Sequence, residues 1–236
     1  MSIQTEGNDW IPQAHRGSVL GLSALVFVIL FGYAIVRPAT ESLFVEAHTA
    51  EALPKAWLLV ALSSVLIVSA YSHWAARIDL VAGFGVISSL SALSLALLWI
   101  AGKCELPGAR YALFVWKDIY IVLLVEIFWS FANQVMPIGK ASRVYGLFLI
   151  IGGLGGILGN LIGGELAPWL GSENVILVAH PLLVCAQLGC LWLSISTGAG
   201  RAALGAQKSN AGLGEGLRVL LGSRVLILLL MLIGIT

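Results

Sequence analysis

Charged residues are the class in which this sequence is poorest. Only 11% of its 236 residues are Asp, Glu, Lys or Arg, whereas a typical soluble domain carries about 25%. Hydrophobic residues make up 59% of the chain, and the mean hydropathy is +0.97. This composition excludes an ordinary soluble domain and predicts a protein with many membrane spans. The net charge of +1 offers no basic surface, so no nucleic-acid partner is expected.

Cysteine is also scarce. The three cysteines, Cys104, Cys185 and Cys190, lack the spacing of a metal site or of a disulfide framework, and we interpret them as packing residues. The sequence contains no nucleophile-elbow, HExxH or phosphate-loop pattern. We therefore predict a protein that is not an enzyme, with no catalytic residues, no metal site and no cofactor.

Long apolar runs are what the sequence has in abundance. The first is uncharged from Ser18 to Val36, which is too long for the apolar core of a secretion signal, about 7–15 residues. It is interpreted as a retained membrane span. A span needs about 20 apolar residues. Six stretches qualify and predict an all-α membrane protein, and they are 17–45, 55–76, 80–101, 110–136, 142–169 and 174–196.

A seventh apolar run begins at Val225 and reaches Thr236, the last residue of the sequence. A helix over 225–236 would be about 18 Å long, less than the bilayer core of about 30 Å. This run is interpreted as the start of a seventh span, and the chain is expected to be a fragment of a longer protein.

Lys and Arg are shared unevenly between the two alternating sets of loops. Cytoplasmic loops carry the excess of these residues, so the N-terminus, 1–16, and the loop 197–224 are predicted to be cytoplasmic, in an inner or plasma membrane. The richer set holds Arg16, Arg77, Lys140, Arg143, Arg201, Lys208, Arg218 and Arg224, and the poorer set holds Arg37, Lys55, Lys103 and Arg110.

The loop 197–224 divides the chain. It is rich in Gly, Ala and Ser and becomes amphipathic from Gly214 to Leu221, which indicates a linker followed by an interfacial helix. Six spans, a long cytoplasmic linker and a further span form the layout of major facilitator transporters, which have two six-helix halves. We predict the N-terminal half of this fold over 17–196, working by alternating access, with the missing C-terminal half as its partner.

Glycines mark the fifth run. Gly155, Gly159 and Gly163 are four residues apart and lie on one helix face, where small residues let another helix backbone approach closely. The segment resembles the GxxxGPxxGG signature of the fifth span in major facilitator antiporters, with Asn160 in place of the proline. A tight helix pair is therefore expected at this face.

Glu126 lies inside the apolar run 110–136, where a charge costs about 2.5–3.5 kcal/mol at the centre of a helix. At 100° per residue, Asn133 shares the face of Glu126, whereas Lys117 lies on the opposite side and nearer the outer surface. Lys117 thus needs a partner from another span, or it extends outward. We interpret Glu126 as lining a solute cavity, with a structural bond between helices as the alternative.

Polar residues also occur in the first and sixth runs. Arg37 and Glu41 are one turn apart near the outer surface and can pair, either as an interfacial anchor or as a substrate contact. Pro38 is expected to kink or end the helix. His180 is interpreted either as a proton relay or as a bond to a neighbouring helix.

Two further segments resemble the ATP/ADP translocase family of nucleotide transporters and its bacterial relatives. Residues 128–133 read Phe-Trp-Ser-Phe-Ala-Asn, and residues 141–148 match its pattern Ala-x-Arg-x-Tyr-x-Leu-Phe. Residues 33–41 resemble the family's Tyr-x-x-x-Arg-x-x-Lys-Asp, with Thr40 in place of the lysine. The resemblance implies a major facilitator antiporter that exchanges ATP and ADP. The candidate substrate or cavity residues are Tyr33, Arg37, Glu41, Lys117, Glu126 and Asn133.

Two alternatives stay open on the sequence. The same fold would serve a transporter of another small solute, and a six-helix bundle would also serve a membrane scaffold or enzyme. In each case the lipid bilayer is the expected surrounding.

Overall fold

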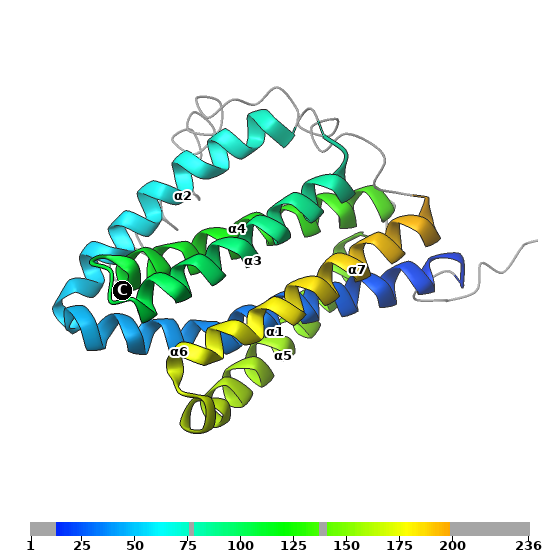
Figure 1. Ribbon diagram of the computed structural model, residues 1–236. Coiled ribbons are helices and arrows are strands. Elements are labelled where there is room, and N and C mark those ends of the chain that lie inside the picture. Colours follow the sequence, from blue (N-terminus) through cyan, green and yellow to red (C-terminus); the bar gives the residue numbers. More distant parts are fainter. Residues whose placement is uncertain (1–12, 76–77, 137–140, 199–236) are drawn as a thin grey trace, which may run out of the picture. The chain divides into compact units, whose positions relative to one another are not determined.

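The computed structural model describes residues 13–75, 78–136 and 141–198, and the regular structure assigned within these ranges is helical (Figure 1). This confirms the predicted all-α fold. The predicted linker and seventh run lie outside the described residues, as does nearly all of the N-terminal segment. The elements are α1 Gln13–His48, η1 Ala50–Ala52, α2 Leu53–Ala75, α3 Leu80–Lys103, α4 Ala109–Val135, α5 Ala141–Leu170, α6 Ser172–Val175, η3 Ile176–Val178 and α7 Ala179–Thr197.

Five helical stretches in the described part are long and apolar enough to cross a membrane, and they cover 16–48, 50–71, 80–103, 144–170 and 172–197. The protein is therefore an integral, multi-pass membrane protein. The helix α4 forms where a span was predicted, over 110–136, but it is not among the five. It carries Arg110, Lys117, Asp118 and Glu126, and many of its apolar side chains are buried. A crossing by α4 stays a prediction.

The helices α1 and α4 lie at the centre of the bundle. The helix α1 packs mainly against α4, α5 and α7, and α4 packs mainly against α1, α2 and α3, while α3 also contacts α7 (Figure 1). This set of contacts is unchanged when α1, α2 and α3 are exchanged with α4, α5 and α7.

Apolar side chains remain exposed on α2 and α5. Protein surfaces that face water rarely carry apolar patches of this extent, whereas hydrocarbon accepts them without cost. Both helices therefore have surfaces suited to lipid or to another apolar partner. The exposed residues include Leu58, Leu62, Leu66, Leu149, Leu154, Ile157 and Leu161.

The glycine face of α5 lies directly against the backbone of α1. A Cβ atom added at Gly155 would be 2.7 Å from the carbonyl oxygen of Phe27, and one at Gly163 would be 2.8 Å from that of Ile35. At Gly159 the added Cβ would meet the carbonyl oxygen of Phe31. Real Cβ atoms essentially never lie closer than 3.0 Å to such an atom, so these glycines permit the close approach of the two helices.

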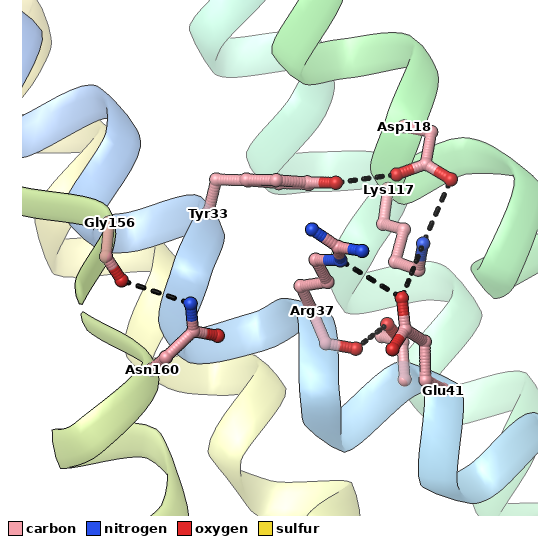
Figure 2. A network of polar contacts seen from close by, with 8 residues as sticks. Tyr33, Arg37, Glu41, Lys117, Asp118, Gly156 and Asn160 are labelled. Carbon is pink, nitrogen blue, oxygen red and sulfur yellow. Dashed lines mark hydrogen bonds and ion pairs between the residues drawn. The ribbon is translucent and has the colours of Figure 1, made fainter. Parts of the chain in front are cut away.

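Two helices contain a residue that departs from simple expectation, Pro38 in α1 and Asn160 in α5. Pro38 lies inside α1, which continues to His48, so it does not end the helix. The hydroxyl of Thr40 donates to the carbonyl oxygen of Arg37 at 2.8 Å beside this position. In α5, Asn160 occupies the place of the signature's proline and donates to the carbonyl oxygen of Gly156 at 3.0 Å (Figure 2).

Candidate functional site

Five polar side chains connect α1 to α4, and together they are called the α1–α4 polar cluster (Figure 2). The ammonium Nζ of Lys117 lies 2.8 Å from Asp118 Oδ2 and 3.8 Å from Glu41 Oε1. The same Glu41 oxygen lies 3.0 Å from Arg37 Nε. The hydroxyl of Tyr33 donates to Asp118 Oδ1 at 2.7 Å. The cluster is thus continuous from one helix to the other.

Local sequence spacing positions the α1 half of the cluster. Tyr33, Arg37 and Glu41 are four residues apart, so an α-helix places them in succession along one face. The predicted pairing of Arg37 with Glu41 is confirmed. On α4 the acid and the base are neighbours in sequence, Lys117 and Asp118, and both reach side chains of α1.

Lys117 is the deepest member of the cluster. Its side chain is 1% exposed, whereas those of Arg37 and Glu41 are 53% and 39% exposed. It is the one fully buried charged side chain among the residues the structure describes. A buried ammonium group is costly unless it is paired. Asp118 supplies the ion pair, and the ring of Phe114 adds a cation–π contact at 4.2 Å from Nζ.

The formal charges of the cluster cancel. Arg37 and Lys117 contribute two positive charges, and Glu41 and Asp118 contribute two negative charges. The two cations that the sequence offered to an anionic substrate are therefore both paired with carboxylates. An anion can use them only if at least one of these ion pairs opens.

Glu126 lies apart from the cluster. It is nine residues after Lys117, which is about 13.5 Å further along α4 and half a turn round the helix. Its side chain is half-buried and interacts electrostatically with Tyr71 of α2. The structure therefore does not bring Glu126 and Lys117 together, in agreement with the helical geometry expected from the sequence.

Asn133 belongs to a third polar position, close to the last turn of α4. Its Oδ1 accepts a hydrogen bond from the hydroxyl of Tyr145 on α5. The ring of Tyr145 lies edge-on to Trp129 at 5.3 Å and stacks with Phe148 at 6.3 Å between centroids. Asn133 is thus hydrogen-bonded to a cluster of aromatic rings, Trp129, Tyr145 and Phe148, that joins α4 to α5.

Ion pairs at one end of the bundle were missed from the sequence. Arg110 Nη1 lies 3.1 Å from Glu46 Oε2, and its Nη2 lies 3.3 Å from Glu173 Oε1. Lys103 also pairs with Glu173. A cavity of about 320 Å³ opens beside Arg110 and is also lined by His48. These charges were visible only as loop residues, and no spacing rule links positions so distant in the chain.

His180 connects α7 to α3. Its Nε2 lies 2.9 Å from the carbonyl oxygen of Ala92, and its Nδ1 lies 3.2 Å from that of Leu177. Pro181 has no N–H to donate to the carbonyl oxygen of Leu177, and the imidazole of His180 contacts that oxygen instead. These contacts are those expected if His180 bonds a neighbouring helix, which was the second of the two interpretations made from the sequence.

Comparison with known proteins gives one match. Residues 111–189, about a third of the chain, match the family model of the TLC ATP/ADP transporter. No curated protein and no solved structure matches the chain. The matched segment contains Lys117 and Asp118, and it supports a resemblance to nucleotide transporters over these residues. It also supports membrane transport, rather than catalysis, as the kind of function that this chain has.

Proposed function

We propose that this chain forms one six-helix bundle of an alternating-access transporter, and that its substrate is an adenine nucleotide, ATP or ADP, in exchange. The substrate's phosphate groups bind at the α1–α4 polar cluster. The observation that carries the proposal is the buried, paired Lys117, which lies inside the segment that matches ATP/ADP transporters.

The arrangement of the helices supports this mechanism. In major facilitator transporters each six-helix half consists of two inverted three-helix repeats, and the substrate site lies near the middle of the membrane. The contacts here are symmetric under exchange of α1 with α4, α2 with α5, and α3 with α7. The polar cluster joins α1 to α4, which are the equivalent first helices of the two repeats.

The chemistry of the cluster suits a phosphate ligand. Arg37 presents a guanidinium group that is half-exposed and can form paired hydrogen bonds to phosphate oxygens. Lys117 adds a compact positive charge deeper in the bundle. Hydrocarbon penalises both charges strongly, so a transporter gains from keeping them only where they meet a charged solute.

The proposed orientation places the N-terminus in the cytoplasm, in an inner or plasma membrane. Lys117 is then about 12 Å from the outer end of α4, and Glu126 is a similar distance from its inner end. We propose that Glu126 and Asn133 line the inner part of the same path. The linker 197–224 would lead to a second bundle that begins at 225.

Exchange in proteoliposomes tests the proposal. The full-length protein is reconstituted with internal ADP, and uptake of labelled external ATP is measured for wild type, Lys117→Gln and Arg37→Gln. Each substitution should lower exchange about tenfold or more, because a charge-assisted hydrogen bond contributes about 1.5–3 kcal/mol. Lys55→Gln is the matched control, since Lys55 is an exposed cation outside the cluster.

Absence of ATP and ADP exchange by the wild type would refute nucleotides as the substrate. Exchange that survives both cluster substitutions at the Lys55→Gln level would refute the site. Melting temperatures of the purified variants separate loss of binding from loss of folding.

Glu126→Gln examines the inner part of the path. The amide keeps the shape of the side chain and removes its charge, so a cavity-lining role predicts a folded protein with sharply reduced uptake. If uptake stays near the wild-type level, Glu126 serves only as a contact between helices.

The charge balance of the cluster favours a second candidate. A neutral group of two cations and two carboxylates also complements a zwitterionic small solute on the same fold. Uptake of labelled amino acids, measured beside uptake of labelled ATP in the same proteoliposomes, distinguishes the two candidates.

A further inference from the structure

We propose that the carboxylate of Glu41 competes with the anionic substrate for Arg37, and that a phosphate group of the substrate displaces it toward Lys117. The inference rests on the proposed function, because it concerns the same site, and it names the ion pair that opens when the substrate binds. Only ion pairs and hydrogen bonds are exchanged in this step, and no covalent bond forms or breaks.

One oxygen atom of Glu41 lies between two cations. Its Oε1 is 3.0 Å from Arg37 Nε and 3.8 Å from Lys117 Nζ (Figure 2). Charge-assisted N–H···O bonds are typically about 2.7–2.9 Å long. The contact with Arg37 is therefore close to a full hydrogen bond, whereas the contact with Lys117 can still shorten. When Glu41 leaves Arg37, a second cation is already within reach, so its displacement does not leave the carboxylate unpaired.

Exposure decides which ion pair an entering anion meets first. The side chains of Arg37 and Glu41 are 53% and 39% exposed, whereas those of Lys117 and Asp118 are 1% and 21% exposed. Lys117 also lies against the ring of Phe114. Ion pairs that solvent reaches are weak, and breaking a buried pair is costly. The pair of Arg37 with Glu41 is therefore the one that opens.

The shape of the guanidinium group explains why the two anions compete. Arg37 bonds Glu41 through Nε, which is one of the donors that a guanidinium group uses to hold a carboxylate or a phosphate by two parallel bonds. A phosphate group that takes this side must replace the carboxylate. A phosphate group bound only at the other nitrogen atoms would still lie beside a like charge. In both cases Glu41 weakens the binding of an anion to Arg37.

A purely structural role of Glu41 predicts the opposite effect. If the ion pair served only to hold Arg37 in place for the substrate, removal of the carboxylate would loosen the guanidinium group and weaken binding. If Glu41 competes with the substrate, the same removal strengthens binding. The sign of the change in affinity therefore separates the two roles.

Binding of ATP to the purified full-length protein in detergent, measured by titration calorimetry, tests the inference. Glu41→Gln keeps the shape of the side chain and removes its charge. The Kd for ATP should fall about threefold or more, since a half-exposed ion pair is worth a factor of this order. Glu46→Gln is the matched control and should keep the wild-type Kd. Glu46 belongs to the same helix and pairs with an arginine, Arg110, at 3.1 Å, outside the cluster.

A second comparison shows whether the gain passes through Arg37. Two residues that act on each other give non-additive effects when both are changed. In the background of Arg37→Gln, adding Glu41→Gln should therefore lower the Kd much less, or not at all. An equal gain in both backgrounds would mean that any lost negative charge favours ATP, and it would overturn the inference.

The remaining outcomes separate the inference from the proposed function. Absence of ATP binding and exchange in the wild type would overturn both. If the wild type binds ATP and the Kd of Glu41→Gln is unchanged or higher, the inference fails and the proposed function stands. Melting temperatures show whether each variant is folded.

If Glu41→Gln does not fold, Glu41→Asp takes its place. The aspartate keeps the charge but is one methylene group shorter, which draws the carboxylate back from Arg37 and weakens the ion pair. Competition then predicts tighter binding of ATP than in the wild type. Unchanged or weaker binding by Glu41→Asp would contradict the inference.

Discussion

Replacing Gly159 with alanine should destabilise the protein, because α5 and α1 touch there through their backbones. The added methyl group would meet the carbonyl oxygen of Phe31 and would lie 2.8 Å from the Cβ of Ala34. Neither obstacle is the flexible end of a side chain. The clash can therefore be relieved only by moving one helix away from the other.

The loss of stability depends on the contacts between α1 and α5 that such a movement weakens. The same face holds Gly155 and Gly163, where an added Cβ would also lie within 3.0 Å of the α1 backbone. A gap of about 0.5–1 Å loses a quarter to a half of each dispersion contact, and overpacking by a methyl group typically costs about 1–3 kcal/mol. We expect Gly159→Ala to lower the free energy of unfolding by about 2 kcal/mol.

Gly153→Ala is the matched control. It lies in the same helix, and a Cβ at this position would have nothing within 4 Å, so its effect should stay within about 0.5 kcal/mol. Titration with sodium dodecyl sulfate in mixed micelles, followed by circular dichroism, measures both variants. Equal stability of Gly159→Ala and Gly153→Ala would refute the close-packing argument.

Two further predictions concern orientation and the α3–α7 contact. Cys104 is exposed just after α3, so a membrane-impermeant maleimide should label it in intact cells. Labelling only after permeabilisation, or unchanged labelling in Cys104→Ser, would contradict the predicted orientation. His180→Leu should lower the free energy of unfolding by about 1–2 kcal/mol, since it removes the imidazole between the carbonyl oxygens of Ala92 and Leu177; a chemical melt with unchanged stability would refute this role.

Helix positions were largely predictable, because apolar runs separated by polar residues mark helix ends in a membrane protein. The run 80–101 became α3, Leu80–Lys103, and the run 110–136 became α4, Ala109–Val135. The first run, 17–45, was predicted a few residues too short at each end, since α1 extends from Gln13 to His48. Packing against three neighbouring helices keeps the polar part of α1, with Arg37, Pro38 and Glu41, helical.

The sixth run shows what hydropathy leaves out. It was predicted as one helix over 174–196, yet the chain passes through α6 and the 3₁₀ turn Ile176–Val178 before α7 begins. Pro181 removes the N–H that would bond Leu177, and the tighter turn accommodates the loss. The mean hydropathy of the run does not indicate this change of helix type.

The site was predictable in part. Four-residue spacing gave the pair of Arg37 and Glu41, and helical geometry separated Lys117 from Glu126. The contact of Tyr33 with Asp118 joins residues 85 positions apart and depends on how α1 lies against α4. Asp118 was overlooked because an acid next to a lysine points about 100° away on an ideal helix, and only the flexible side chains bring the two charges together.

This omission changes the chemistry that the site can perform. The sequence offered two cations, Arg37 and Lys117, to attract an anion, and it predicted a carboxylate partner, Glu41, for Arg37 alone. The structure adds Asp118 as the partner of Lys117, so an anion must compete with existing ion pairs at both cations. Binding then requires an event that weakens those pairs.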